Sequence, residues 1–144
     1  MINLRSYRQY WTDRIETATH IGGVLEIAID KDMAKKIQSL PKGVNTLFIL
    51  PPISSMGGSS ADRLRSSDTC ILFIMRKYDP MRQTAFQTLE EAQPAIEEIA
   101  QILITDFSRS CSTWRLATEH ISIMPETEFF AGFAGWSIEF KVAT

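Results

Sequence analysis

Only His20 and His120 could supply an imidazole for acid–base or metal chemistry. Neither has a Cys, Asp or Glu at the spacing that zinc fingers or metalloproteases use. His20 is expected near the end of an opening helix, where the helix dipole favours a cation, and His120 is expected to point outward from a strand. We therefore predict structural roles for both histidines, with no metal site and no cofactor.

A glycine- and serine-rich run from Gly57 to Ser60 could be taken for a phosphate-binding loop. The Gly-Lys-Ser/Thr ending of such a loop is missing, and no helical pattern follows at once. The chain contains no Gly-x-Ser-x-Gly sequence, and the serines around position 110 have no recognisable partner base. A flexible loop is the better interpretation, and serine hydrolysis has no positive support.

Charged side chains offer two further possibilities. Adjacent glutamates at 90–91 and 97–98 could form carboxylate pairs, but they fall on the polar side of a helical pattern, which is typical of a solvated surface. Basic residues gather in and beside two long linkers, where they are either ordinary loop charges or partners for carboxylates on another subunit. These basic residues are Arg63, Arg65, Arg76, Lys77 and Arg82.

One domain must position these side chains. A chain of 144 residues can bury one core without disulfides or metals, and its 44% hydrophobic and 22% charged residues are near globular averages. We predict a single domain over residues 1–144, with long loops at about 51–68 and 78–87. The formal net charge of -2 disfavours sequence-independent binding to nucleic acid.

The N-terminal residues lack the apolar core of a signal peptide, and no apolar run approaches the ~20 residues that span a bilayer. Cys70 lies in an apolar run and Cys111 in a polar, serine-rich stretch, so the two do not suggest a disulfide. We therefore expect a cytosolic protein with reduced thiols, neither secreted nor embedded in a membrane.

Hydrophobic periodicity predicts helices and strands along the chain. The segment 69–77 has a continuous apolar run from Cys70 to Met75, so we expect a strand buried on both faces at the centre of a sheet. Thr88 and Glu91 have the spacing of a capping box, although Pro94 predicts a kink or a later start of that helix. The predicted helices are 4–18, 31–40 and 88–107, and the predicted strands are 24–29, 44–50, 69–77, 114–117 joined or not to 119–124, and 136–142.

The strand at 136–142 has the clearest pattern. Its even-numbered residues are apolar, whereas Ser137, Glu139 and Lys141 between them are polar, so one face should be buried and the other polar. The strands arrive in pairs rather than alternating strictly with helices, which favours a largely antiparallel sheet. The predicted fold class is α+β in the order α-β-α-β-β-α-β-β, with two or three helices covering one face of the sheet.

This order of elements resembles the phage tail-terminator, or tail-completion, family of minor tail proteins. The resemblance covers nearly the whole chain but rests on element order rather than on a diagnostic motif. Its parts are the amphipathic helix 4–18, the strand ending in Leu50-Pro51-Pro52, the long loop before residues 70–75, the helix 88–107 and the ending Gly135-Trp136-Ser137-Ile138-Glu139-Phe140-Lys141-Val142.

The resemblance implies a non-enzymatic structural protein that forms a homo-oligomeric ring, commonly a hexamer, at the head-proximal end of a tail tube. Such a subunit assembles in the cytoplasm and enters the virion, where it contacts tail-tube and head-to-tail connector proteins, without membrane or sequence-specific nucleic-acid binding. The contact loops would be 56–65 and 78–87. The expected interface residues are Met56, Arg63, Arg65, Met81 and Arg82, with Glu139 and Lys141 facing a ring neighbour or the lumen.

Two alternatives remain open from the sequence. One is a small-ligand-binding domain or an unrecognised enzyme, with a pocket lined by Trp136, Phe130 and Tyr78 and a loop arginine that holds an anionic group. The other is an adaptor of a related contractile or conjugative machine. The identity of the neighbouring genes would distinguish a tail protein from a metabolic one.

Overall fold

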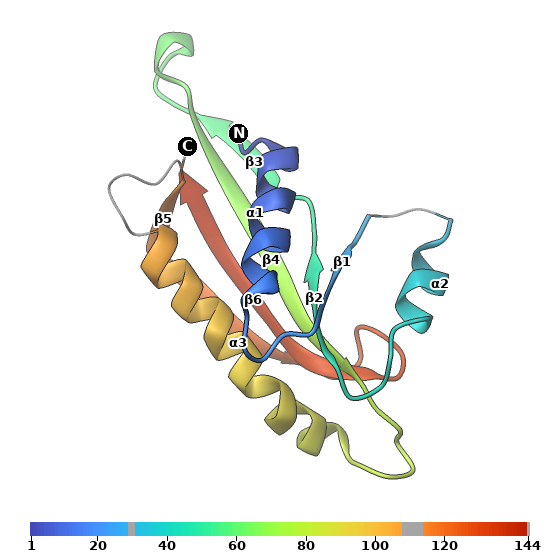
Figure 1. Cartoon of the computed structure of the whole chain (residues 1–144). Coiled ribbons are helices and arrows are strands. Elements are labelled where there is room, and N and C mark those ends of the chain that lie inside the picture. The colour runs from blue at the N-terminus through green and yellow to red at the C-terminus, as the bar shows by residue number, and fades with distance from the viewer. Residues whose placement is uncertain (29–30, 108–113, 144) are drawn as a thin grey trace.

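The computed structural model describes residues 1–28, 31–107 and 114–143, apart from the side chains of Thr118 and Glu119 (Figure 1). Helices and strands alternate irregularly along the chain, as expected for an α+β fold. The elements are α1 (Leu4–Glu16), β1 (Gly23–Glu26), α2 (Met33–Gln38), β2 (Asn45–Ile49), β3 (Ile53–Gly57), the 3-10 helix η1 (Ala61–Arg63), β4 (Arg65–Lys77), α3 (Ala85–Phe107), β5 (Arg115–Glu126) and β6 (Phe133–Ala143).

The strands form a single, mostly antiparallel sheet in the order β1-β2-β4-β6-β5, and β3 pairs with the first half of β4. Only β1 and β2 run parallel to each other among the described pairs. The predicted α+β class and the central place of the strand containing 69–77 are confirmed. The strand β3 is additional to the predicted order of elements.

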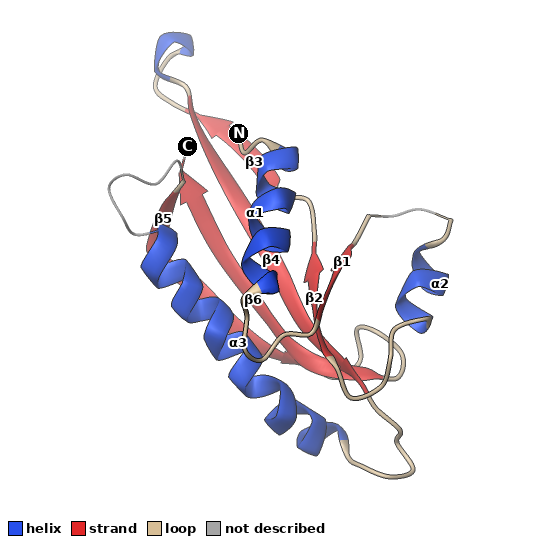
Figure 2. Ribbon diagram, viewed as in Figure 1, coloured by secondary structure: helices blue, strands red, loops and turns tan. Residues whose placement is uncertain are grey.

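Helices α1 and α3 pack on one face of the sheet, which we call the helix face (Figure 2). Tyr7 and Trp11 of α1 are fully buried there against β4 and β6. Among the described residues, the opposite face, which we call the outer face, is covered only at one end, where Ile37 of α2 and the segment 130–133 pack on Phe48 and Phe73. Two helices therefore cover one face as expected, and α2 covers part of the other, because β4 is apolar on both sides near Phe73 and each side needs cover.

The predicted loop at 51–68 is also wrong, since it contains β3, η1 and the start of β4. Backbone pairing joins Ile53 to Thr69 and Gly57 to Arg65, so the segment forms a hairpin. Its side chains are mostly polar or small and show no alternation of apolar and polar residues. Sequence periodicity therefore gave no signal for a strand that is held mainly by backbone pairing with β4.

Helix α3 begins at Ala85, earlier than predicted, because another capping box starts it. The backbone N–H of Gln87 donates to Thr84 Oγ1 at 3.1 Å, and the N–H of Thr84 donates to Gln87 Oε1 at 2.9 Å. Thr88 is buried instead, and its hydroxyl donates to the carbonyl of Thr84 at 3.1 Å. Pro94 lies inside the helix, so the helix does not start there, and the loop before it is 78–84 rather than 78–87.

The strands β6 and β5 complete the sheet on the side of β4 away from β2. The two predicted segments of β5 are joined, with a register shift between Ala117 and Ser122. The alternation predicted for β6 is confirmed, with Ile138 buried towards the helix face and Glu139 exposed on the outer face. Strand β6 begins before the predicted boundary, and a Cβ at Gly135 would lie 1.8 Å from the carbonyl oxygen of Ile74, so only glycine permits this approach of β6 to β4.

Candidate assembly surface

A hairpin made by residues 53–66 projects from the end of the sheet, and we call it the arm (Figure 1). Every residue from Ile53 to Arg65 is exposed. Ser67 pairs with Ser55 on one side and with Ala143 of β6 on the other, whereas Arg65 and Ser66, nearer the tip, pair with no described residue of β6. The outer part of the arm is therefore a two-stranded ribbon that η1 closes at its tip.

Large apolar side chains of the arm are exposed to solvent. Ile53 is 66% exposed, Met56 is 67% exposed and Leu64 is 50% exposed. Ile53 pairs with Thr69 on the outer face, whereas Met56 pairs with Ser66 on the helix face, so both sides of the arm carry an apolar group. A two-stranded hairpin has no layer of its own in which to bury them.

The arm also carries Arg63 and Arg65, which form no ion pair with another described residue. Both were predicted as interface residues, as was Met56, and the structure brings these three together in the arm. The root of the arm is fixed by Asp68, whose side chain is fully buried. Asp68 accepts a hydrogen bond from the backbone N–H of Ile2 at 3.1 Å and another from the hydroxyl of Ser54.

Beside the arm, the outer face of the sheet is open. Glu139 of β6 pairs with Ile71 of β4 and Ser122 of β5, and Lys141 pairs with Thr69 and Ala117. Glu139 is exposed, and Lys141 is half-buried. These two predicted residues therefore lie on an uncovered part of the sheet next to the root of the arm.

Met81 and Arg82 are placed elsewhere, in the loop that follows the other end of β4. Met81 is 92% exposed, and Arg82 pairs with Asp79 of the same loop at 3.8 Å. Arg76 is held by Glu91 at 2.8 Å, and Lys77 Nζ donates to the carbonyl of Gln38 at 2.6 Å. The structure thus separates the predicted interface residues into two groups at opposite ends of β4.

The turn between β5 and β6 carries exposed residues that are outside the set of expected interface residues. Phe130 and Phe133 are packed against Phe48, with ring centroids at 5.0 and 6.2 Å. Phe129 stacks on Phe73 at 5.1 Å but remains 63% exposed, and Met124 is 55% exposed. Which aromatic ring of this turn stays exposed depends on the fold.

The aromatic pocket considered from the sequence does not form. Trp136 packs on the helix face, where its indole N–H donates to the carbonyl of Leu89 at 2.9 Å. Phe130 packs on the outer face with Phe48 and Phe73. Trp136 and Phe130 therefore lie on opposite sides of the sheet and cannot line one cavity.

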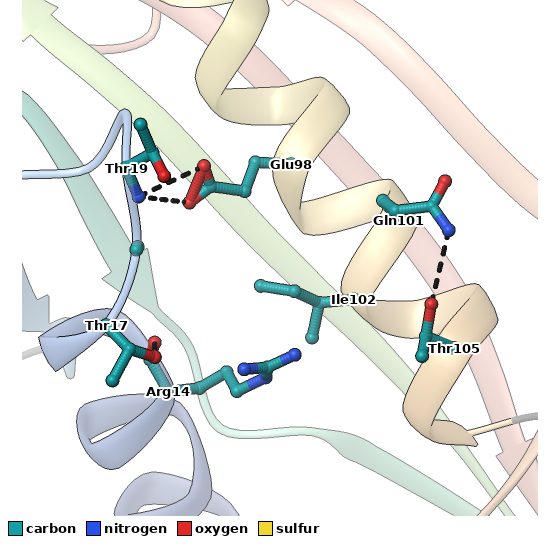
Figure 3. Close-up of a pocket in the computed structure, with 8 residues that line it drawn as sticks. Arg14, Thr17, Thr19, Glu98, Gln101, Ile102 and Thr105 are labelled. Atoms are coloured by element: carbon teal, nitrogen blue, oxygen red, sulfur yellow. Dashed lines mark hydrogen bonds between the residues drawn. The ribbon is translucent and has the colours of Figure 1, made fainter.

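A polar hollow of about 290 Å³ lies between the end of α1 and α3 (Figure 3). Its charged groups are already engaged, because Glu98 accepts the backbone N–H groups of Thr19 at 2.8 Å and His20 at 3.3 Å. Arg14 donates to Asp106 at 3.1 Å. The charged groups of the hollow hold α1 to α3, so Glu98 is half-buried and makes a structural contact, whereas Glu91 is exposed as predicted but also pairs with Arg76.

His20 lies beyond the end of α1 at Glu16, so it is not in the last turn where the helix dipole would act, whereas His120 is exposed on β5 as predicted. Burial raises the pKa of the Cys70 thiol to about 12, which keeps it protonated and unreactive in the core. Cys111 and the serines around position 110 lie outside the described residues.

In the described part of the chain, His, Cys, Asp and Glu side chains form no cluster of three or more that could hold a metal ion. None of the helices described is both long enough and apolar enough to cross a bilayer. Comparison with models of known protein families and with curated proteins finds no match. The surface of the molecule is therefore the guide to its function.

Proposed function

We propose that this chain is a non-enzymatic structural subunit of a phage or prophage tail, which forms a ring that closes the head-proximal end of the tail tube. The observation that carries the proposal is the arm, in which every residue from Ile53 to Arg65 is exposed although Ile53, Met56 and Leu64 are large and apolar. The order of elements around it is similar to that of tail-terminator proteins.

The arm supports assembly because its apolar side chains gain free energy only when another molecule covers them. Full burial of one such side chain contributes roughly 1.5–3 kcal/mol before the costs of association are subtracted. The open outer face beside the arm offers a second, different surface. Contacts between two different surfaces join subunits head to tail, and they close into a ring when the rotation between subunits permits.

The expected interface residues fall into two groups at opposite ends of β4, so the proposed ring would have two different contact surfaces. Arg63 and Arg65 lie at one end of β4, whereas Met81 and Arg82 follow its other end. In the proposal, one group contributes to subunit contacts, and the loop 78–84 reaches the tail tube or the head-to-tail connector. A subunit that closes a tube needs contacts of this kind on opposite sides.

Two measurements test the proposal. Light scattering after size-exclusion chromatography gives the mass of the protein at high concentration, and electron microscopy shows whether it caps tubes made from the tail-tube protein that a neighbouring gene encodes. We expect a homo-oligomeric ring in solution or on the tube end, at one end of each tube only. A strict monomer that also leaves the tubes uncapped contradicts the proposal.

A further inference from the structure

We infer that the arm of one subunit lies on the outer face of a second copy of this chain, over an acidic patch beside the β5–β6 turn. The inference rests on the proposed function and names the surfaces that join one ring subunit to the next. The acidic patch consists of Met124, Glu126, Glu128, Phe129 and Glu139.

Pairing and contacts bring four members of the acidic patch together, and the fifth, Glu128, precedes Phe129 in the turn. Met124 pairs with Ser137, and the Ser137 hydroxyl donates to Glu126 Oε1 at 2.9 Å. Phe129 stacks on Phe73, which is the partner of Ser137 on β4. Glu139 follows Ser137 on the same side of β6, because alternate residues of a strand share a face. The patch is therefore continuous around Ser137, although its residues come from two strands and a turn.

The arm carries a net positive charge, with Arg63 and Arg65 against one acid, Asp62, and the patch is negative, with Lys141 lying beyond it on the side of the arm root. Arg63 and Arg65 of the arm, like Glu128 and Glu139 of the patch, form no ion pair with another described residue. Arginine suits carboxylates because its planar guanidinium can donate two parallel hydrogen bonds to one of them. Complementary charges steer the encounter of two surfaces and fix their register.

Apolar groups lie within both charged surfaces. The arm presents Ile53, Met56 and Leu64, and the patch presents Met124, which is 55% exposed, and Phe129, which is 63% exposed. Interface cores are enriched in methionine and aromatic residues, with charged groups around them. The same composition on both sides matches a contact that buries apolar groups within a ring of Arg–Glu pairs.

The arm cannot reach the patch of its own subunit. Arg65 in the arm and Phe73 beneath the patch both belong to β4 and are eight residues apart, which is roughly 26 Å of strand. The arm projects away from the sheet beyond Ser67, in the direction opposite to Phe73. The contact must therefore join two molecules, and it is of the head-to-tail kind because each molecule contributes a different surface.

Charge reversal with a mixing step tests this contact. One variant carries Arg63→Glu and Arg65→Glu, and the other carries Glu128→Arg and Glu139→Arg. In either variant alone, the arm and the patch carry the same sign of charge and repel each other at every contact. We therefore expect the apparent Kd for self-association to rise at least about tenfold. An equal mixture should regain assembly, because the reversed arm of one variant meets the reversed patch of the other, and the two unchanged surfaces also meet.

A matched control carries Glu90→Arg and Glu97→Arg, which change the same number of exposed glutamates on α3. The control should assemble like the wild type, and circular dichroism checks that all variants are folded. Mass photometry of the protein alone, and electron microscopy of rings on tail tubes, give the readout.

The outcomes separate this inference from the proposed function. Two outcomes overturn the arm–patch contact and leave the tail function standing. In the first, the wild type forms rings and both charge-reversed variants form them too. In the second, the variants fail to assemble and mixing them does not restore assembly. A wild type that forms no ring alone or on tubes overturns both. Loss of assembly in each variant, with recovery of assembly in the mixture, supports the arm–patch contact.

Discussion

The helix face and the arm contain similar kinds of side chain but expose them to opposite degrees. Under α1 and α3, residues such as Trp11 and Leu72 are fully buried, whereas Ile53 and Met56 in the arm are about two-thirds exposed. Both regions share the strand β4, which runs from the arm into the core. The buried half of β4 contributes to the free energy of folding, and in the proposed ring the exposed half contributes to association.

Two glycines give the largest predicted contrast between these regions. Alanine at Gly135 would place a Cβ 1.8 Å from the carbonyl oxygen of Ile74, whereas alanine at Gly57 meets nothing within 4 Å. We expect Gly135→Ala to lower the free energy of unfolding by about 3 kcal/mol or more, because backbone must move. Gly57→Ala should change it by less than about 0.5 kcal/mol. Urea unfolding measures the free energy of unfolding of both variants. Equal losses in the two would contradict the difference between the core and the arm.

Asp68 should show an intermediate effect because it connects the two regions. Asp68→Ala removes the buried acceptor of the Ile2 N–H and the Ser54 hydroxyl. Leaving buried donors without a partner costs about 1–3 kcal/mol. We also expect weaker self-association, since the root of the arm is no longer fixed. Asp68→Asn retains one acceptor oxygen and should fall between the alanine variant and the wild type in thermal unfolding.

The buried thiol of Cys70, in the core half of β4, should make the stability of the protein depend on pH. Its pKa is raised from 9.0 to about 12 by burial, so the contribution to stability is complete below pH 9 and is lost as the pH rises towards 12. From pH 9 to 10, the wild type should lose about 1 kcal/mol more of its free energy of unfolding than Cys70→Ala. Urea midpoints in a Cys111→Ser background measure the difference, and parallel pH curves would show that the thiol ionises equally in both states.

The smallest effect on folding is expected in the arm. Ile53→Ser, Met56→Ser and Leu64→Ser should each change the free energy of unfolding of the isolated subunit by less than about 0.5 kcal/mol, because these side chains are exposed. Combined, they should abolish self-association in mass photometry. Ile104→Ser, at a residue of α3 that is also 50% exposed, is the matched control and should leave association unchanged.

Parts of the fold with strong periodicity could be predicted from the sequence. The alternation of Ile138 with Glu139 identified β6, and the continuous apolar run around Phe73 identified the central strand. The strand β3 could not be predicted, because backbone pairing with β4 holds side chains that carry no pattern. Thr84 and Thr88 both fit the start of a capping box, and only the burial of Thr88 decides between them.

The candidate surface was predictable in composition but not in arrangement. The arginines and methionines of both loops were recognised from the sequence, but their separation to opposite ends of β4 follows from topology. The acidic patch needs the register that places Met124 opposite Ser137. Such a register is set by contacts between distant segments, so no local pattern reveals it.

The buried contact of Asp68 with Ile2 and Ser54 also has a kinetic consequence. It sets the direction of the arm before two molecules meet, so little conformational entropy remains to be lost at its root during binding. Pre-organisation of this kind raises the fraction of encounters that become productive. A ring built from such subunits would assemble at a rate governed by diffusion and charge rather than by ordering of the chain.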